Sequence, residues 1–193
     1  MGATRRTMLS LAATLGLAAL GPARAASPIG PAGVKAAELL AKLAQSGRGF
    51  AMQPGGADRP QVRIAFDSQC TDGHKLWFAV NALASRVAIT WYPVAVMNRR
   101  SESQGAALLA AADPVASMEA HLAAYASPSA GLLVDAQAIS DELRDAVWLN
   151  TNLLRRAGAL SVPVGVLEDT SGQVLVFDER AKSADLRRHL GLA

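Results

Sequence analysis

A strand, a helix and a second strand follow one another in the middle of the chain, and this succession restricts the fold most. Residues 62–66 are a short apolar run, and residues 87–96 are rich in β-branched and aromatic side chains, so both stretches are typical of strands. Between them, residues 71–86 repeat apolar side chains at helical spacing. Such a succession indicates two parallel strands of one sheet joined by a crossover helix. We therefore expect an α/β domain built around this unit.

The elements on either side of this unit complete the order of a single domain. We predict a linker at residues 53–60, a polar loop at residues 98–104, and a hairpin formed by residues 162–167 and 174–177. Further helices are predicted at residues 34–45, at two stretches of the alanine-rich region 105–126 that Asp113-Pro114 separates, at residues 140–156, and from Ser183 as its cap to Gly191. This is the order of a thioredoxin-like α/β fold with a helical insertion between the strand–helix–strand unit and the C-terminal hairpin and helix.

The first 25 residues have the three parts of an export signal. Arg5-Arg6 supplies a basic start, residues 8–20 are apolar, and Ala23-Arg24-Ala25 is a small-x-small cleavage site. The apolar run is too short to cross a bilayer, which disfavours a stable membrane anchor. Residues 4–9 resemble the twin-arginine type of signal, and the export route stays open between that pathway and the general one. We expect a periplasmic protein whose signal is cleaved near Ala25.

Cleavage at this site divides the chain into three parts and changes its charge. Residues 1–25 form the signal, residues 26–59 an N-terminal helix and linker, and residues 60–193 the thioredoxin-like domain. Three of the 19 Lys and Arg residues leave with the signal, so the mature chain carries as many basic as acidic residues. A balanced charge gives no reason to expect nucleic acid or an anionic membrane surface as a partner.

Cys70 is the only cysteine of the sequence, and it lies where the first strand of the unit gives way to the helix. A thiol at a helix N-terminus faces the positive end of the backbone dipole, which favours the reactive thiolate form. His74 and Lys75 follow within about one turn and act in the same direction, whereas Asp72 opposes them. A single cysteine forms no internal disulfide, so this thiol is buried and inert, paired with another molecule, or functional.

The segment Asp67-x-x-Cys70-x-x-Gly73-His74-Lys75 resembles the active site of the periplasmic DsbC/DsbG disulfide isomerases, where Asp-x-x-Cys-x-x-Cys precedes a basic helical run. Three further stretches are similar in character and order to the DsbG branch: residues 91–104, the helical region from Ala107 through His121, and residues 152–164. The likeness covers about residues 60–191. Its two most specific points are the Cys70 segment and Val162-Pro163.

This resemblance implies roles for the matching residues. Cys70 corresponds to the nucleophile of the family, and Val162-Pro163 corresponds to the cis-proline loop that lets a substrate backbone pair beside the thiol. The sequence departs from the family at two points. Gly73 stands in place of the second, resolving cysteine, and residues 26–59 are too short and too helical to be the N-terminal dimerisation domain of those isomerases.

The residues and the resemblance together predict a monothiol protein of the periplasm. It exchanges or isomerises disulfides, or reduces oxidised cysteines, through Cys70, with His74 and Lys75 stabilising the thiolate and Val162-Pro163 docking the substrate. The expected partners are periplasmic proteins with disulfides or oxidised cysteines, and either a thiol reductant such as glutathione or a membrane electron donor. No cofactor, metal or nucleic acid is expected.

Two alternatives stay open. The fold can persist without redox chemistry, as a binding or chaperone module in which Cys70 is a small apolar filler and the groove beside Pro163 holds peptides. Cys70 and His74, with Met97 as a third candidate, are also soft ligands for copper or zinc, but they are fewer than a structural zinc site requires. The rate at which an alkylating reagent modifies the thiol distinguishes the enzyme from the module.

The remaining aromatic and imidazole side chains are expected to be structural. Trp77, Trp91 and Trp148 fall on apolar stripes and are predicted to lie in the core. His121 and His189 lie on predicted helices, and neither is assigned a catalytic role.

Overall fold

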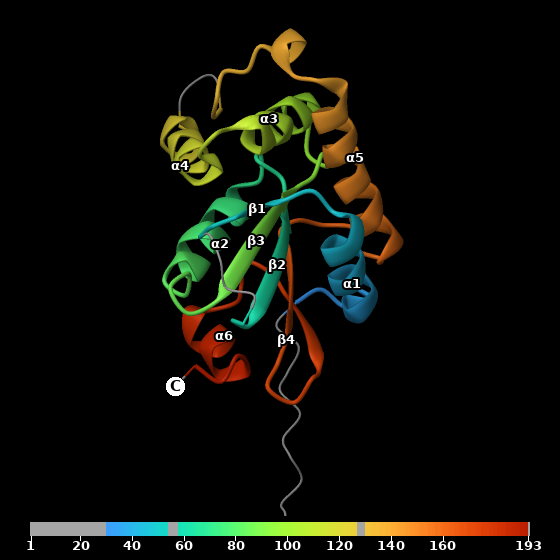
Figure 1. Ribbon diagram of the computed structural model, residues 1–193, viewed down its shortest axis with the longest axis vertical. Coiled ribbons are helices and arrows are strands. Elements are labelled where there is room, and N and C mark those ends of the chain that lie inside the picture. The colour runs from blue at the N-terminus through green and yellow to red at the C-terminus, as the bar shows by residue number, and fades with distance from the viewer. Residues whose placement is uncertain (1–29, 54–57, 127–129, 193) are drawn as a thin grey trace, which may run out of the picture.

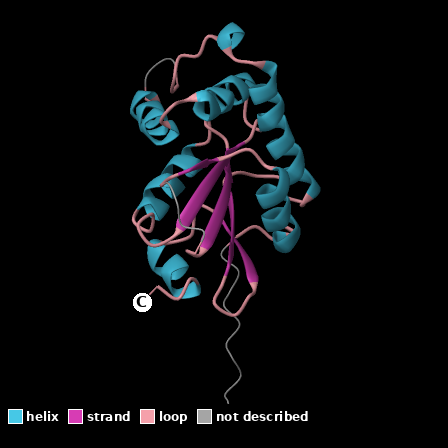
Figure 2. Cartoon of the chain, viewed as in Figure 1, coloured by secondary structure: helices cyan, strands magenta, loops and turns pink. Residues whose placement is uncertain are grey.

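A five-stranded mixed sheet lies between helices in this computed structural model, which describes residues 30–53, 58–126 and 130–192 (Figures 1 and 2). The predicted signal, residues 1–25, lies outside the described residues. The strands are β1 (Phe50–Ala51), β2 (Gln61–Phe66), β3 (Ala88–Pro93), β4 (Val164–Glu168) and β5 (Val174–Phe177), in the order β1-β3-β2-β4-β5. The predicted α/β architecture is confirmed.

The predicted strand–helix–strand unit forms the centre of the sheet. Strands β2 and β3 are parallel, and α2 (Thr71–Asn81) connects them. Strand β4 pairs with β2 and β5 in the antiparallel sense, which makes β4 and β5 the predicted hairpin. The two-residue strand β1 pairs with β3 and was not predicted, because two residues are too short to show an alternating pattern.

Helices cover both faces of the sheet (Figure 1). Helices α2 and α6 (Ser183–His189) lie on one face, where one large cluster of buried side chains joins Trp77 and Leu186 to Phe66 and Trp91 of the strands. Helices α1 (Ala36–Ser46) and α5 (Asp141–Arg156) lie on the other face. The predicted N-terminal helix is therefore packed into the same core as the segment that follows residue 60.

The predicted polar loop at residues 98–104 is wrong, because this segment begins the helix α3 (Arg99–Ala110). Asn98 caps the helix: its side chain accepts a hydrogen bond from the Arg100 N–H, and its own N–H donates to Ser101 Oγ. The buried face of α3 carries the polar side chains of Ser101 and Gln104. Both form hydrogen bonds with polar groups of the protein. Hydrophobic spacing does not detect a helix of this kind.

Helix α4 (Pro114–Ala124) begins where the sequence indicated. Asp113 is its N-cap and accepts a hydrogen bond from the Ala116 N–H at 3.0 Å. A short 3-10 helix (Ala136–Ala138) precedes α5. Helices α3 and α4 lie together at the end of the molecule where β2 and β3 finish, as the predicted helical insertion (Figure 1).

Several details differ from the sequence-based expectation. Strand β3 ends at Pro93, three residues before the predicted end, and β4 begins at Val164, two residues after the predicted start. Helix α2 ends at Asn81, five residues before the predicted end, and turns follow it. Ser183 is the first helical residue of α6 instead of its cap, and its hydroxyl donates to the carbonyl of Ala79 on α2. Trp148 is 40% exposed because its indole N–H donates to Glu102 at the surface, whereas Trp77 and Trp91 are buried as predicted.

None of the described helices combines the length and the hydropathy that a membrane span requires.

Candidate functional site around Cys70

Cys70 is the N-cap residue of α2, and its Sγ lies 3.3 Å from the carbonyl oxygen of Val162, to which the thiol donates. The strand register explains this contact. Ala65 of β2 pairs with Val164 of β4 in the antiparallel sense, so the residues after Ala65 lie beside the residues before Val164. The peptide bond between Val162 and Pro163 is cis. The structure therefore brings together Cys70, Val162 and Pro163, as expected, although Cys70 itself is only 7% exposed.

Gly73 lies in the first turn of α2, three residues after Cys70. A Cβ added at Gly73 would approach the Asp67 carbonyl oxygen at 3.7 Å and the Phe66 Cβ at 3.9 Å, which are ordinary contacts. Its backbone is helical and has no positive φ. The position therefore accepts a Cβ, and packing does not require a glycine there.

Asp67 fixes the loop that carries Cys70. Its carboxylate is fully buried and accepts three backbone hydrogen bonds: one from Gln69 N at 2.9 Å, and two from Val96 N and Met97 N at 2.7 and 2.9 Å. The last two donors lie in the segment that follows β3. The carboxylate therefore joins the ends of the two parallel strands and determines where α2 begins.

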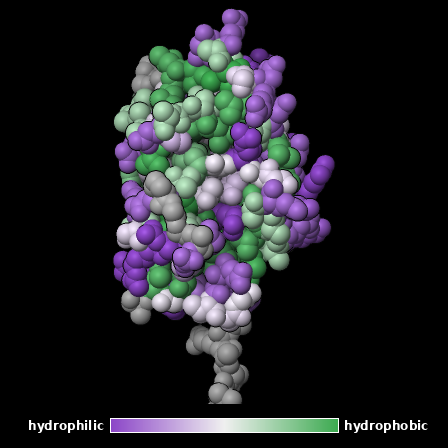
Figure 3. Space-filling view, in the orientation of Figure 1, coloured by the Kyte–Doolittle hydropathy of each residue, from purple (hydrophilic) through white to green (hydrophobic). Residues whose placement is uncertain are grey.

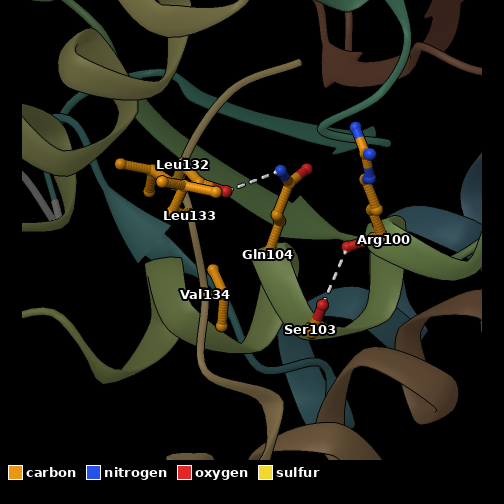
Figure 4. A pocket seen from close by; sticks show the side chains of 6 residues that line it. All are labelled: Arg100, Ser103, Gln104, Leu132, Leu133 and Val134. Atoms are coloured by element: carbon orange, nitrogen blue, oxygen red, sulfur yellow. Dashed lines mark hydrogen bonds between the residues drawn. The ribbon is translucent and has the colours of Figure 1, made fainter. Parts of the chain in front are cut away.

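Gln104 of α3 joins the same loop to the helical insertion. Its Oε1 accepts hydrogen bonds from Ser68 Oγ at 3.2 Å and Gln69 Nε2 at 2.7 Å. Its Nε2 donates to the carbonyl oxygens of Ala130 and Leu132, at 3.3 and 2.9 Å; Figure 4 shows the second of these bonds. One buried amide therefore ties the two residues before Cys70 to a segment about 60 positions further along the chain.

Two histidines donate to a single carbonyl oxygen beside the thiol loop. His74 Nε2 and His121 Nε2 lie 3.0 and 2.8 Å from the oxygen of Ser68. His121 Nδ1 also accepts from the Leu132 N–H at 3.2 Å, which assigns the proton of the neutral ring to Nε2. The Tyr125 hydroxyl donates to the carbonyl oxygen of Gln69 at 2.7 Å, and its ring packs edge-on against His74.

The two predicted thiolate stabilisers differ in their electrostatic setting. Burial lowers the pKa of His74, against the effect of its bond to Ser68, which favours the neutral imidazole. Lys75 extends into solvent and forms an ion pair with Asp72 at 2.7 Å, which raises the lysine pKa. An electrostatic interaction with Cys70 also raises the lysine pKa, to a smaller extent. Cys70 itself lies at the positive end of α2, as the sequence indicated.

Sequence reasoning missed His121, Gln104 and Tyr125 as parts of the site. His121 lies on α4 beside the buried Met118, and a histidine on a buried helical stripe needs a polar partner, which was the available signal. Gln104 and Tyr125 gave no signal in the sequence, because their partners lie far along the chain and most of them are backbone groups.

The alternative of a copper or zinc site at Cys70 and His74 needs further ligands. Within the described ranges, no group of three or more His, Cys, Asp and Glu residues lies close enough to hold an ion. His74 Nε2 is already bonded to the carbonyl oxygen of Ser68.

We predict that this histidine pair makes folding stability depend on pH. Burial lowers the pKa of both His74 and His121, so the unfolded chain takes up protons near pH 6.5 while the folded protein does not. The free energy of unfolding is then highest above pH 6.5 and falls below it, by at most about 1.4 kcal/mol per pH unit for each histidine. Asp67, which faces His121, acts in the opposite direction.

Urea unfolding at pH 7.5 and pH 5.5 tests this prediction. We expect a lower midpoint at the acidic pH, and a smaller difference in the His121→Gln variant, whose amide can still donate to Ser68. His189→Gln, at the end of α6, is the control for the loss of an imidazole elsewhere. Equal midpoints of the wild-type protein at the two pH values would contradict the prediction.

No protein-family model matches this chain, and no curated protein sequence matches it. Solved structures do match. The catalytic domain of Proteus mirabilis ScsC has 15% identity and a TM-score of 0.60, over 80% of this chain and 96% of that domain. Helicobacter pylori DsbG has 16% identity and a TM-score of 0.53, over 69% of this chain and 62% of that one. The thiol-disulfide exchange protein α-DsbA2 of Wolbachia pipientis has 12% identity and a TM-score of 0.56, over 81% and 94%.

These similarities define the fold class. The chain has a thioredoxin-like fold, as the order of its elements predicted. The structures that it resembles include proteins described as thiol-disulfide exchange proteins and thioredoxin-like oxidoreductases. Identities of 12–16% establish the fold and leave the activity to be argued from the residues of this chain.

Proposed function

We propose that this protein is an exported monothiol member of the thioredoxin-like exchange proteins, with Cys70 as its nucleophile. The observation that carries the proposal is the position of Cys70 Sγ at the N-terminus of α2, 3.3 Å from the Val162 carbonyl of the cis-proline loop. A thiol at a helix N-terminus is set for nucleophilic attack, because the helix dipole stabilises the thiolate. The adjoining loop offers a place for the substrate backbone.

The proposed reaction is thiol–disulfide exchange. The Cys70 thiol loses its proton to solvent, and the thiolate attacks one sulfur of a substrate disulfide. One Cys70–substrate disulfide forms, the substrate disulfide breaks, and the other substrate sulfur leaves as a thiolate. With a sulfenic acid as the substrate, the Cys70 thiol forms the same mixed disulfide and releases water.

The second step has no internal thiol, because Cys70 is the only cysteine of the sequence; the resemblance puts Gly73 at the position of the family's resolving cysteine. In isomerisation, a different thiolate of the substrate attacks the mixed disulfide, forms a new substrate disulfide and restores Cys70, without net oxidation. In reduction, an outside thiol such as glutathione, or a membrane electron donor, must release Cys70. Isomerisation of the DsbG type is the version that a single thiol completes with the substrate alone.

Substrate docking is proposed at the loop that ends in Val162-Pro163. Leu160 is 86% exposed and Ser161 is also exposed, so the loop offers backbone and side-chain groups to a partner. An extended segment of the substrate would add alongside these residues and present its sulfur to Cys70. The proposed substrates are periplasmic proteins with disulfides or oxidised cysteines, which follows from the export signal predicted in residues 1–25.

We predict that replacing Gly73 by cysteine shortens the lifetime of the mixed disulfide. In the wild-type protein, a disulfide between Cys70 and a model substrate should persist until an outside thiol is added. In Gly73→Cys, the new thiol lies three residues from Cys70 in the first turn of α2 and should release the substrate by forming an internal disulfide. Non-reducing electrophoresis and mass spectrometry of the intact protein measure both species over time.

The matched control is Gly73→Ala. It adds a Cβ that makes only ordinary contacts and removes a helical glycine, so it should raise the free energy of unfolding by about 0.5–1 kcal/mol and leave the mixed disulfide long-lived. Cys70→Ser should form no mixed disulfide. The proposal fails if wild-type protein forms no more of it than Cys70→Ser does.

A redox-inactive binding or chaperone module is the second candidate, and two observations favour it. Cys70 is 7% exposed and its thiol donates to a carbonyl oxygen, which are also properties of a structural cysteine. This candidate predicts that peptides bind beside Pro163 equally well in wild-type protein and in Cys70→Ser.

A further inference from the structure

A groove of about 500 Å³ lies between α2 and α4, next to the thiol loop. Its apolar wall includes Phe78, which is 64% exposed, together with Leu122 and the exposed Ala123. In the space-filling view, hydrophobic residues gather on the upper part of the molecule, where Figure 1 places α3 and α4 (Figure 3). A phenylalanine this exposed, beside an apolar hollow, is typical of a surface that receives another apolar group.

The groove is physically joined to the loop that carries Cys70. His74 and Tyr125 line it, with ring centroids 4.3 Å apart. The same two side chains donate to the carbonyl oxygens of Ser68 and Gln69, the two residues that precede Cys70. The groove therefore adjoins the two residues that precede Cys70, and a substrate segment bound in it would lie beside the thiol loop.

The charge of the groove indicates what kind of segment fits it. Glu119 is the one charged side chain among the lining residues; it is exposed, and no ion pair of the described residues includes it. A carboxylate at the edge of an apolar groove favours a cation next to an apolar group, and disfavours an acidic segment.

We propose that this groove binds a large apolar side chain of the substrate polypeptide, with a neighbouring lysine or arginine paired to Glu119. The assignment rests on the proposed exchange function and adds its substrate class: proteins in which an apolar–basic sequence lies close to the reactive cysteine. Phe78 and Leu122 contact the apolar side chain, and Glu119 selects the charge.

Fluorescence anisotropy with two labelled synthetic peptides tests the groove without using the thiol. Both peptides carry serine in place of the reactive cysteine; one has Phe-Lys beside it and the other Ser-Glu. We expect the Phe-Lys peptide to bind the full-length protein at least about tenfold more tightly. Phe78→Ser should remove most of that difference, and Glu119→Lys should shift the preference toward the acidic peptide.

The rate of exchange with glutathione disulfide separates this proposal from the one on which it rests. Phe78→Ser and Glu119→Lys should react with that small disulfide at the wild-type rate, because neither residue contacts Cys70 in the proposed reaction. Equal binding of the two peptides to wild-type protein would overturn the groove assignment whether or not Cys70 reacts. A changed preference in Glu119→Lys would support it even if Phe78→Ser does not fold.

Discussion

Replacing Asp67 by alanine is expected to lower the free energy of unfolding by about 3 kcal/mol, because each buried N–H left without a partner costs about 1–3 kcal/mol. The carboxylate accepts from Gln69 N, Val96 N and Met97 N, and these bonds hold the ends of β2 and β3 together. Without it, the turn that places Cys70 at the start of α2 is released. Urea unfolding measures the loss of stability, and the alkylation rate of Cys70 measures the change at the thiol.

Asp169→Ala is the matched control for this prediction. Asp169 also accepts three hydrogen bonds, from the N–H and hydroxyl of Ser171 and from Gln173 N, but in the β4–β5 turn, where water replaces a lost acceptor. It should destabilise the protein less than Asp67→Ala and leave the alkylation rate unchanged. Equal losses in the two variants would show that the buried carboxylate has no special role in the thiol loop.

Gly165→Val is expected to destabilise the protein by about 3 kcal/mol, the upper part of the range for overpacking a well-packed core. Gly165 pairs with Phe177 across β4 and β5, and a Cβ at Gly165 would overlap the fully buried ring of Phe177. Valine is otherwise favoured in strands, so the loss would come from the collision. Thermal unfolding followed by circular dichroism measures it.

The collision has a consequence for the site, because Gly165 lies two residues after Pro163. A shift of β4 away from Phe177 would move the Val162 carbonyl relative to Cys70 Sγ. Gly73→Ala, at a glycine where a Cβ makes only ordinary contacts, is the comparison and should be stabilising. If Gly165→Val unfolds at the wild-type temperature, the Phe177 ring is not packed over this glycine.

The order of the elements was predictable because each depends on local patterns. The apolar run of β2, the spacing in α2 and the Asp113 cap of α4 act over a few residues, and all three were confirmed. The start of α3 was not predictable from apolar spacing, since it buries Ser101 and Gln104 against polar partners elsewhere in the chain. Strand β1 exists only because β3 offers it a partner.

The candidate site was predictable in part for the same reason. The helix start at Cys70 is a local feature. The contact between Cys70 and Val162-Pro163 was expected from the family resemblance. His74 and Lys75 were expected to stabilise the thiolate because both are basic residues within about one helical turn of Cys70. That expectation used only their positions in the sequence. Burial against α4 lowers the pKa of His74 and so favours its neutral form, and Asp72 pairs with Lys75; the first of these effects depends on tertiary packing.

The rate at which iodoacetamide modifies Cys70 in the folded protein at neutral pH tests the central claim most directly. Intact-mass spectrometry follows the single addition, with Cys70→Ser as the blank and urea-unfolded protein as the reference thiol. If Cys70 is a nucleophile at the start of α2, the folded protein reacts faster than the unfolded chain. If the thiol is modified only after unfolding, Cys70 is not a nucleophile in the folded protein. The redox-inactive binding module would then be the function that the structure supports.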